Sequence, residues 1–353
     1  MDDRSFVAAQ DFILEAKCYW TKVIYPQLKQ DFEDRVRTMD PTPDTVSAVA
    51  DVIGDTVLYR YYSWLERHLQ RLKYSGRYGL YPYHHERRDA LLASLSDERR
   101  AEVNPGLELP QYYRNVDIHQ HPGGVWSDEI AGFVYERGAR STTPLMGTGH
   151  KDLHQRLTDF AATTGPVPTH ILDMGCGFGK STRPLYETFK EAKVEAIDLS
   201  APCIRLGALD AASSNCHVNF RQMDAMNTGY DDGTFDLVTS TMLVHELPPP
   251  KIDRLFDEAT RLLQPGGRMV HLDFHFLPNA FARFIHYGHG RRNNEPFMEP
   301  WAEMNIAQIL KKKGLVNVQV FPFKEAEGAD REDYLYWRFP WTIIYAEKQV
   351  VDN

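Results

Sequence analysis

The sequence has few cysteines, no long hydrophobic run and no excess of basic residues. Its four cysteines, Cys18, Cys176, Cys203 and Cys216, form no C-x-x-C pair, which leaves neither a zinc-ligand spacing nor a redox motif. Reduced thiols of this kind are typical of intracellular proteins. No stretch reaches the roughly 18 apolar residues of a membrane span, and the N-terminus lacks the apolar segment of a secretion signal. We therefore predict a cytoplasmic protein with no membrane partner.

The charge balance is acidic. Lys and Arg number 40 against 49 for Asp and Glu, so the formal net charge is −9. Binding held mainly by nucleic-acid phosphates or anionic lipid needs a net basic face, which disfavours a nucleic-acid partner. With 353 residues, 42% of them hydrophobic, the chain is long enough for a large buried core and about two domains.

The first hundred residues have a helical pattern. Apolar residues recur at three- and four-residue spacing over 6–20 and again over 46–72, which predicts one apolar face on each of two helices. Pro26 is expected to kink or end the first of them. A third helix is predicted over 86–103, and another over 151–163.

From residue 169 the pattern changes to short apolar runs that alternate with helical stretches, the rhythm of a parallel α/β sheet. The last two strands have no obvious helix between them, which indicates an antiparallel hairpin at one edge. We predict a helical domain over 1–106, a linker and cap segment over 107–164, and an α/β core over 165–353. Seven strands are expected, at 170–174, 194–199, 218–222, 235–240, 268–274, 316–323 and 341–347.

A strand, a glycine-rich turn and a helix start follow one another over 171–182, with the sequence I-L-D-M-G-C-G-F-G-K-S-T. A phosphate-binding P-loop would need a glycine at Met174, and a dinucleotide fingerprint would need one at Lys180, so neither pattern is complete. The turn still allows close approach of the backbone to a ligand, because glycine has no Cβ.

The pattern D-x-G-C-G-x-G resembles motif I of the class I S-adenosylmethionine-dependent methyltransferases. This resemblance implies a Rossmann-like fold with S-adenosylmethionine as the cofactor. It also implies that the acidic residue of the motif attracts the ammonium group of the cofactor while the glycines let it approach. The positions concerned are Asp173, Gly175, Gly177 and Gly179.

Further segments carry the same resemblance in the same order. The second strand ends in an acidic residue that in this family accepts both ribose hydroxyls, and the segment 223–226 is similar to the one that contacts adenine. Segments 233–238 and 263–270 match the openings of the fourth and fifth strands. Together these segments cover about half of the chain. They add five cofactor-binding positions, namely Asp198, Leu199, Asp224, Ala225 and Thr241.

Within this superfamily, residues 224–248 resemble the ubiquinone/menaquinone C-methyltransferase-like group, and the segment 112–124 resembles members with an N-terminal helical extension. The resemblance implies transfer of a methyl group to a small-molecule acceptor, and we expect a role in specialised metabolism. A second hypothesis is a protein of the same fold that binds S-adenosylmethionine without methylation, with a pericyclase-like or regulatory role, because fold does not fix function.

His245 and His275 are the candidate catalytic residues. His245 follows the fourth strand, and a histidine in a similar Leu-His-Asp-Trp setting is the general base of phenolic O-methyltransferases, although Glu246 stands here in place of the aspartate. A helix-start histidine bonded to backbone is the alternative. His271, Asp273 and His275 alternate along the fifth strand and share one side of the sheet. Positions i and i+4 of a strand lie about 13 Å apart, so we predict no metal site.

The acceptor is less defined than the cofactor. Residues 277–292 are aromatic and basic, which favours an aromatic or anionic acceptor, with a solvated surface loop as the alternative. Tyr112, Tyr113 and Tyr135 are expected either to close over the cofactor or to fill an interdomain core. An exposed apolar stripe on the helical domain would also allow two subunits to pair as a homodimer.

Overall fold

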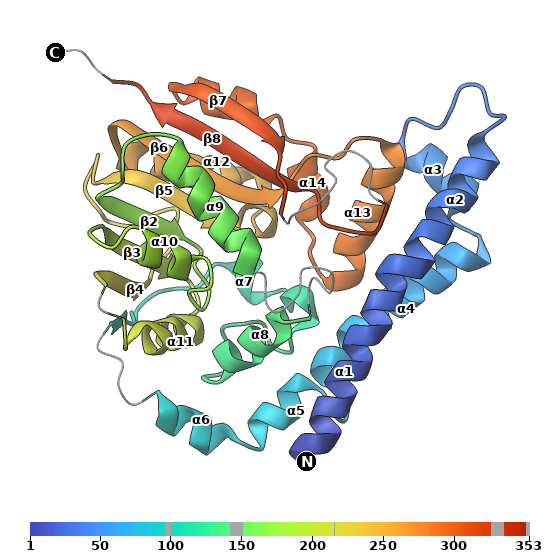
Figure 1. The fold of residues 1–353 in the computed structure, drawn as a ribbon, viewed down its shortest axis with the longest axis horizontal. Coiled ribbons are helices and arrows are strands. Elements are labelled where there is room, and N and C mark those ends of the chain that lie inside the picture. Colours follow the sequence, from blue (N-terminus) through green and yellow to red (C-terminus); the bar gives the residue numbers. More distant parts are fainter. Residues whose placement is uncertain (96–99, 142–150, 215, 326–334, 351–353) are drawn as a thin grey trace.

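The computed structural model describes residues 1–95, 100–141, 151–214, 216–325 and 335–350. One mixed sheet forms the centre of the molecule, helices cover both of its faces, and long N-terminal helices lie along one side (Figure 1). The strands are β1 (Ala101–Glu102), β2 (His170–Met174), β3 (Lys193–Asp198), β4 (Val218–Gln222), β5 (Phe235–Thr241), β6 (Leu263–Phe274), β7 (Leu315–Pro322) and β8 (Trp341–Lys348).

The helices precede, separate and follow the strands. Those before β2 are α1 (Asp3–Tyr19), η1 (Trp20–Ile24), α2 (Tyr25–Val36), α3 (Val46–Ile53), α4 (Val57–Ser75), α5 (Leu80–His85), α6 (Arg88–Ser94), α7 (Gln111–Arg114), η2 (Ile118–Gln120), α8 (Ala131–Ala139) and α9 (Lys151–Thr163). Those after it are α10 (Thr182–Thr188), α11 (Ala201–Ala211), η3 (Val244–Glu246), α12 (Pro249–Leu262), α13 (Ala280–Asn293), α14 (Met298–Ala302) and α15 (Ile306–Lys312).

The sheet has the order β1-β4-β3-β2-β5-β6-β8-β7. Strands β1 to β6 pair in parallel, while β8 runs antiparallel between β6 and β7. The prediction of a mostly parallel sheet with an antiparallel edge hairpin is therefore confirmed. The strand order reverses between β2 and β5, and in open α/β sheets ligands bind at such a switch point, outside the carboxyl ends of the strands.

The strand count was underestimated by one. All seven expected strands are present, but β1 pairs with β4 at the sheet edge, where Ala101 lies opposite Phe220. The helix expected over 86–103 therefore ends early, with α6 at Ser94. The reason is that two residues paired at an edge carry no periodic signal of their own, and tertiary pairing overrides local propensity. The helix expected over 46–72 is likewise interrupted, because Thr56 caps a new helix at the start of α4.

Two apolar cores lie on the two faces of the sheet. Helices α9, α10 and α11 pack on one face with the N-terminal helices, and α12, α14 and α15 pack on the other. Trp20, Tyr62 and Val49 share the first core with strand residues such as Val270. The N-terminal helices thus share one continuous apolar core with this face of the sheet, and α3 and α4 contact α13. The boundaries at 106 and 164 stay a prediction.

The long N-terminal helix changes its hydrogen-bond register at Pro26. The Tyr25 N–H bonds back five residues to the Trp20 carbonyl, which makes η1 a π-helical turn. Proline has no N–H, so the Thr21 carbonyl loses its partner within the helix and accepts the Trp337 N–H at 3.4 Å instead. This hydrogen bond attaches the segment around Trp337 to the N-terminal helices.

Within the described ranges, no helix combines the length and apolar character that a membrane crossing needs.

Candidate active site

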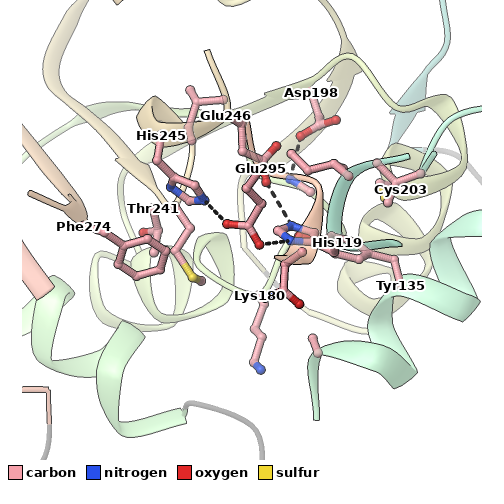
Figure 2. Close-up of a pocket in the computed structure, with 18 of the residues that line it drawn as sticks. His119, Tyr135, Lys180, Asp198, Cys203, Thr241, His245, Glu246, Phe274 and Glu295 are labelled. Atoms are coloured by element: carbon pink, nitrogen blue, oxygen red, sulfur yellow. Dashed lines mark hydrogen bonds and ion pairs between the residues drawn. The ribbon is translucent and has the colours of Figure 1, made fainter. Parts of the chain in front are cut away.

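A cavity opens at the carboxyl ends of β2, β3 and β5, at the switch point of the sheet (Figure 2). The cavity volume that is open to the centre of a water molecule is about 190 Å³. Its walls come from the turn after β2, from the ends of β3 and β5, and from the N-terminal helices α1 and α4. The predicted helical domain therefore contributes directly to the same cavity as the glycine-rich turn.

The three glycines of the turn have left-handed backbone conformations but different neighbours. Gly175 and Gly177, with φ of 66° and 53°, line the cavity. A Cβ at Gly177 would point toward Tyr135 in the cavity wall, at 3.8 Å. Gly179 does not line the cavity, because it packs against the ring of Phe220, which a Cβ would approach to 2.8 Å. Its requirement for glycine therefore comes from this packing and from its φ of 84°.

Asp173 lies behind the turn rather than in the cavity wall. Its Oδ2 accepts hydrogen bonds from Ser181 Oγ at 2.8 Å and Thr182 Oγ1 at 2.7 Å, which ties β2 to the start of α10. Burial raises the pKa of Asp173 to about 6, although both hydroxyls oppose that rise. A contact of Asp173 with the cofactor stays a prediction.

Asp198 ends β3 and lines the cavity. Its Oδ2 accepts the Gly177 N–H at 2.9 Å and its Oδ1 accepts the Ser200 N–H at 2.7 Å. Each carboxylate oxygen can accept more than one hydrogen bond, so both can still accept a ligand hydroxyl. Burial raises the pKa of Asp198 to about 6 against the effect of these two backbone donors.

The remaining predicted cofactor positions also reach the cavity, namely Leu199, Asp224, Ala225 and Thr241. Asp224 follows β4, and its Oδ1 accepts the Met226 N–H at 2.9 Å. Thr241 ends β5, and among the described residues its buried Oγ1 has no hydrogen-bond partner. The cavity thus offers carboxylates that can accept hydrogen bonds from hydroxyl and amino groups, a glycine backbone that allows close approach, and apolar side chains. Together these groups fit S-adenosylmethionine.

His245 is buried in the cavity wall and is paired with Asp273. The His245 Nδ1 donates to Asp273 Oδ1 at 2.7 Å, and Asp273 Oδ2 accepts the Val244 N–H at 2.7 Å. Burial alone would lower the pKa of His245, but the carboxylates of Asp273, Glu246 and Glu295 outweigh it and raise that pKa. Asp273 thus orients the ring so that Nε2 is the nitrogen left for a ligand.

His275 lies outside this cavity. It follows the last residue of β6, packs on Trp301 with ring centroids 4.7 Å apart, and has its Nε2 3.0 Å from the Met304 carbonyl oxygen. His271 is also turned away and bonds Ser240 Oγ through Nδ1 at 2.7 Å. The three alternating residues therefore do not converge, and no group of three or more His, Cys, Asp or Glu side chains in the described ranges could hold a metal ion.

An aromatic wall lies beside His245 in the cavity. Phe274 lies against the His245 ring, with centroids 4.6 Å apart, and stacks on Phe339 at 4.2 Å. Trp337 lies 4.8 Å from Phe339 and 5.0 Å from Trp20 of the π-helical turn. Four aromatic side chains from three distant parts of the chain thus form one apolar subsite beside a polar imidazole.

The tyrosines singled out in the sequence, Tyr112, Tyr113 and Tyr135, all line the cavity. The basic segment instead forms most of α13, where its arginines bind protein groups. Arg283 donates to the Asp44 carbonyl, Arg291 pairs with Glu299, and Arg292 pairs with the buried Glu66. These contacts leave the segment without an evident role as an anion site.

Comparison with known proteins agrees with this geometry. A family model described as a methyltransferase domain matches residues 171–267. The chain is 30% identical over 170 residues to a demethylmenaquinone methyltransferase of Clavibacter sepedonicus. This alignment covers 48% of this chain and 65% of that protein. It is 31% identical over 209 residues to the chloroplastic tocopherol O-methyltransferase of Arabidopsis thaliana, and this alignment covers 56% of each protein. The chain thus spans less than two thirds of either relative.

A solved structure of phosphoethanolamine N-methyltransferase 2 of Haemonchus contortus, in complex with S-adenosyl-L-methionine, is also similar, with a TM-score of 0.46. It is 17% identical in sequence, and the likeness covers 68% of this chain and 60% of that one. The match over residues 171–267 and the two methyltransferase relatives bear out the resemblance to class I S-adenosylmethionine-dependent methyltransferases that the glycine-rich turn and the segments after it indicate.

Three polar residues of the site were not assigned a role from the sequence. Asp273 was noted only as a member of an alternating strand pattern, and its partnership with His245 depends on strand pairing. His119 lies within the segment 112–124, whose histidines were the one available signal. Glu295 follows α13 and carries no local signal, because it reaches the cavity only through the packing of α13.

Proposed function

We propose that the protein transfers a methyl group from S-adenosylmethionine to a hydroxyl group on a small aromatic acceptor. The observation that carries this proposal is the His245–Asp273 pair in the wall of the cavity that also holds Asp198 and the glycine-rich turn. A positioned imidazole can take the proton of a hydroxyl as the oxygen attacks. The aromatic wall beside it favours a flat ring over an anionic acceptor.

The residues of the cavity divide into two sets. Asp198 would accept the ribose hydroxyls, Asp224 the adenine amino group, and Gly177 would leave room for the cofactor backbone. When bound, S-adenosylmethionine supplies a methyl group activated by its sulfonium centre. On the acceptor side, His245 holds the hydroxyl and removes its proton, while Trp20, Phe274, Trp337 and Phe339 orient the ring and exclude water.

The test is a calorimetric titration of the purified protein with S-adenosylmethionine and, separately, with S-adenosylhomocysteine, followed by a methyl-transfer assay. Catechol and 2-naphthol serve as phenolic probes and benzylamine as an amine probe. We expect micromolar binding of both cofactor forms and transfer to a phenolic probe. Binding without transfer to any probe would favour the non-methylating alternative, and absence of binding would overturn the proposal.

The exposed face of α4 supports pairing of two subunits. Val57 is 85% exposed and Trp64 55% exposed, and with Tyr61 and Leu72 they form an apolar stripe at helical spacing. Such a patch on a surface favours a protein contact. We expect a dimer by light scattering after size-exclusion chromatography, and a monomer for Trp64→Glu.

The matched control for that experiment is Val167→Glu, which places the same charge at an apolar side chain that is 76% exposed between α9 and β2. It is expected to leave the dimer intact. A wild-type monomer at assay concentrations would contradict the pairing. A cytoplasmic location and a role in specialised metabolism stay predictions.

A further inference from the structure

A chain of buried charged groups extends from His245 across the cavity wall (Figure 2). His119 donates from Nδ1 to Glu295 Oε1 at 3.0 Å and from Nε2 to Glu246 Oε1 at 3.1 Å. The other oxygen of Glu295, Oε2, faces His245 Nε2 at 4.0 Å. His119 and Glu295 are 176 residues apart in sequence, so this arrangement depends on the fold as a whole.

The protonation states of the pair follow from their contacts. Burial alone would raise the pKa of Glu295, but the charge and hydrogen bond of His119 lower it to about 2. Burial alone would lower the pKa of His119, but Glu295 and Glu246 raise it to about 10. At neutral pH the pair is therefore a carboxylate beside an imidazolium.

The backbone on both sides of this ion pair contains left-handed residues that are not glycine. His119 and Gln120 have φ of 56° and 57°, and Asn294, next to Glu295, has φ of 58°. Side chains hold these residues in place, because Gln70 Nε2 donates to the His119 carbonyl at 2.8 Å and Asn294 Nδ2 donates to the Asp117 carbonyl at 3.1 Å. Left-handed residues other than glycine persist only where the surroundings over-determine them, and they concentrate at functional sites.

The 4.0 Å separation of His245 Nε2 and Glu295 Oε2 is too long for a direct hydrogen bond. A hydroxyl oxygen at about 2.8 Å from His245 Nε2, an ordinary hydrogen-bond distance, can donate its one proton to that nitrogen, while the carboxylate of Glu295 acts on the imidazole through its charge. Both residues line the cavity beside Phe274 and Phe339. The gap is thus placed where the hydroxyl of an aromatic acceptor would enter.

We propose that Glu295 is a positioning residue of His245, whose negative charge stabilises the imidazolium that forms when His245 takes the hydroxyl proton, and that His119 holds Glu295 in place. The inference rests on the proposed function. The hydroxyl proton passes to His245 Nε2 as the oxygen forms its bond to the methyl carbon, and the electron pair of the broken carbon–sulfur bond stays on sulfur. Glu295, on one side of the new imidazolium, and Asp273, on the other, stabilise its charge.

The first test is Glu295→Gln, with catechol as the probe if the wild type methylates it, and otherwise the phenolic probe that it does methylate. We expect kcat to fall at least 10-fold while binding of S-adenosylhomocysteine is unchanged. The acid limb of the kcat/KM profile should move to lower pH, because one of the carboxylates that raise the pKa of His245 is lost. The groups that face His245 are Asp273, Glu246, Glu295 and His286. Glu295→Asp, which keeps the charge, should leave the limb near its wild-type position.

The matched control is Glu258→Gln. Glu258 is a buried carboxylate whose pKa is lowered to about 2 by Arg261 and Thr228 against the effect of burial, and it lies outside the cavity. This variant is expected to lose stability and keep the pH profile. For His119, the test is a double-mutant cycle: His119→Gln should lower kcat in the wild type but cause no further loss in Glu295→Gln, because His119 acts through Glu295.

The outcomes separate the two proposals. If the wild type methylates a phenolic probe but Glu295→Gln has wild-type kcat and an unshifted profile, Glu295 does not act on His245 and the proposed function stands. Additive losses in the cycle would overturn the positioning role of His119. If the wild type binds S-adenosylhomocysteine but methylates no phenolic probe, both proposals fail together.

Discussion

Replacement of Asp198 by alanine is expected to weaken binding of S-adenosylhomocysteine by 100-fold or more. Asp198 is the buried carboxylate in the cavity that is held by the backbone N–H groups of Gly177 and Ser200, and its free lone pairs face the cavity where the ribose hydroxyls would lie. Hydrogen bonds to charged groups contribute about 1.5–3 kcal/mol each. Loss of two such bonds corresponds to this change in the dissociation constant, which isothermal titration calorimetry measures.

The matched control is Asp236→Ala. Asp236 also accepts backbone N–H groups, from Thr169 at 2.7 Å and His170 at 3.1 Å, but it lies near the amino end of β5, whereas the cavity lies at the carboxyl end. It should cost about 1–3 kcal/mol of stability and leave cofactor binding unchanged. Undiminished binding by Asp198→Ala would refute the assignment of the cofactor site.

The same carboxylate makes a pH dependence testable. Because burial raises the pKa of Asp198 to about 6, the group takes up a proton as the pH falls through that value. A protonated carboxyl loses charge and acceptor capacity. Binding of S-adenosylhomocysteine to the wild type should therefore be weaker at pH 5 than at pH 7.5, and a flat profile would contradict this role of Asp198.

The parts of the fold with a local pattern could be predicted from the sequence. Each of the seven expected strands is present. Five of them belong to the parallel part of the sheet, where a buried strand is a short apolar run bounded by turns, and the other two form the antiparallel hairpin. The two-residue strand β1 and the break at Thr56 were missed because an edge pairing and a single cap have almost no periodic signal. Likewise, Gly175, Gly177 and Asp198 lie on one motif and its neighbouring strand, so their convergence at the switch point follows from the topology.

The acceptor side of the site could not be predicted in this way. Trp20, His119 and Glu295 come together through the packing of helices distant in sequence, and no spacing rule connects them. His275 shows the converse limit. The strand alternation correctly groups it with Asp273, but β6 ends at Phe274, and the chain then turns His275 toward Trp301 instead of the cavity.

Replacement of His245 by alanine is expected to lower kcat for methylation of a phenolic probe by 100-fold or more and to leave the affinity for S-adenosylhomocysteine unchanged. A positioned general base contributes about 10²–10⁴-fold. Asp198 and Gly177, which are predicted to bind the cofactor, lie at the end of β3 and on the turn after β2, and their hydrogen bond does not involve the imidazole. Steady-state kinetics with saturating cofactor, together with calorimetry, separates the two effects.

The dependence of wild-type kcat/KM on pH gives a second test of His245. Since Asp273, Glu246 and Glu295 raise the pKa of His245, the neutral imidazole needed as base forms at higher pH than in an ordinary histidine, and kcat/KM should rise with pH through that shifted pKa. His271→Ala is the control, because His271 is equally buried but bonds Ser240 outside the cavity. An equal loss of kcat in both variants would mean that packing rather than proton transfer explains the effect, and His245 would then be a structural histidine.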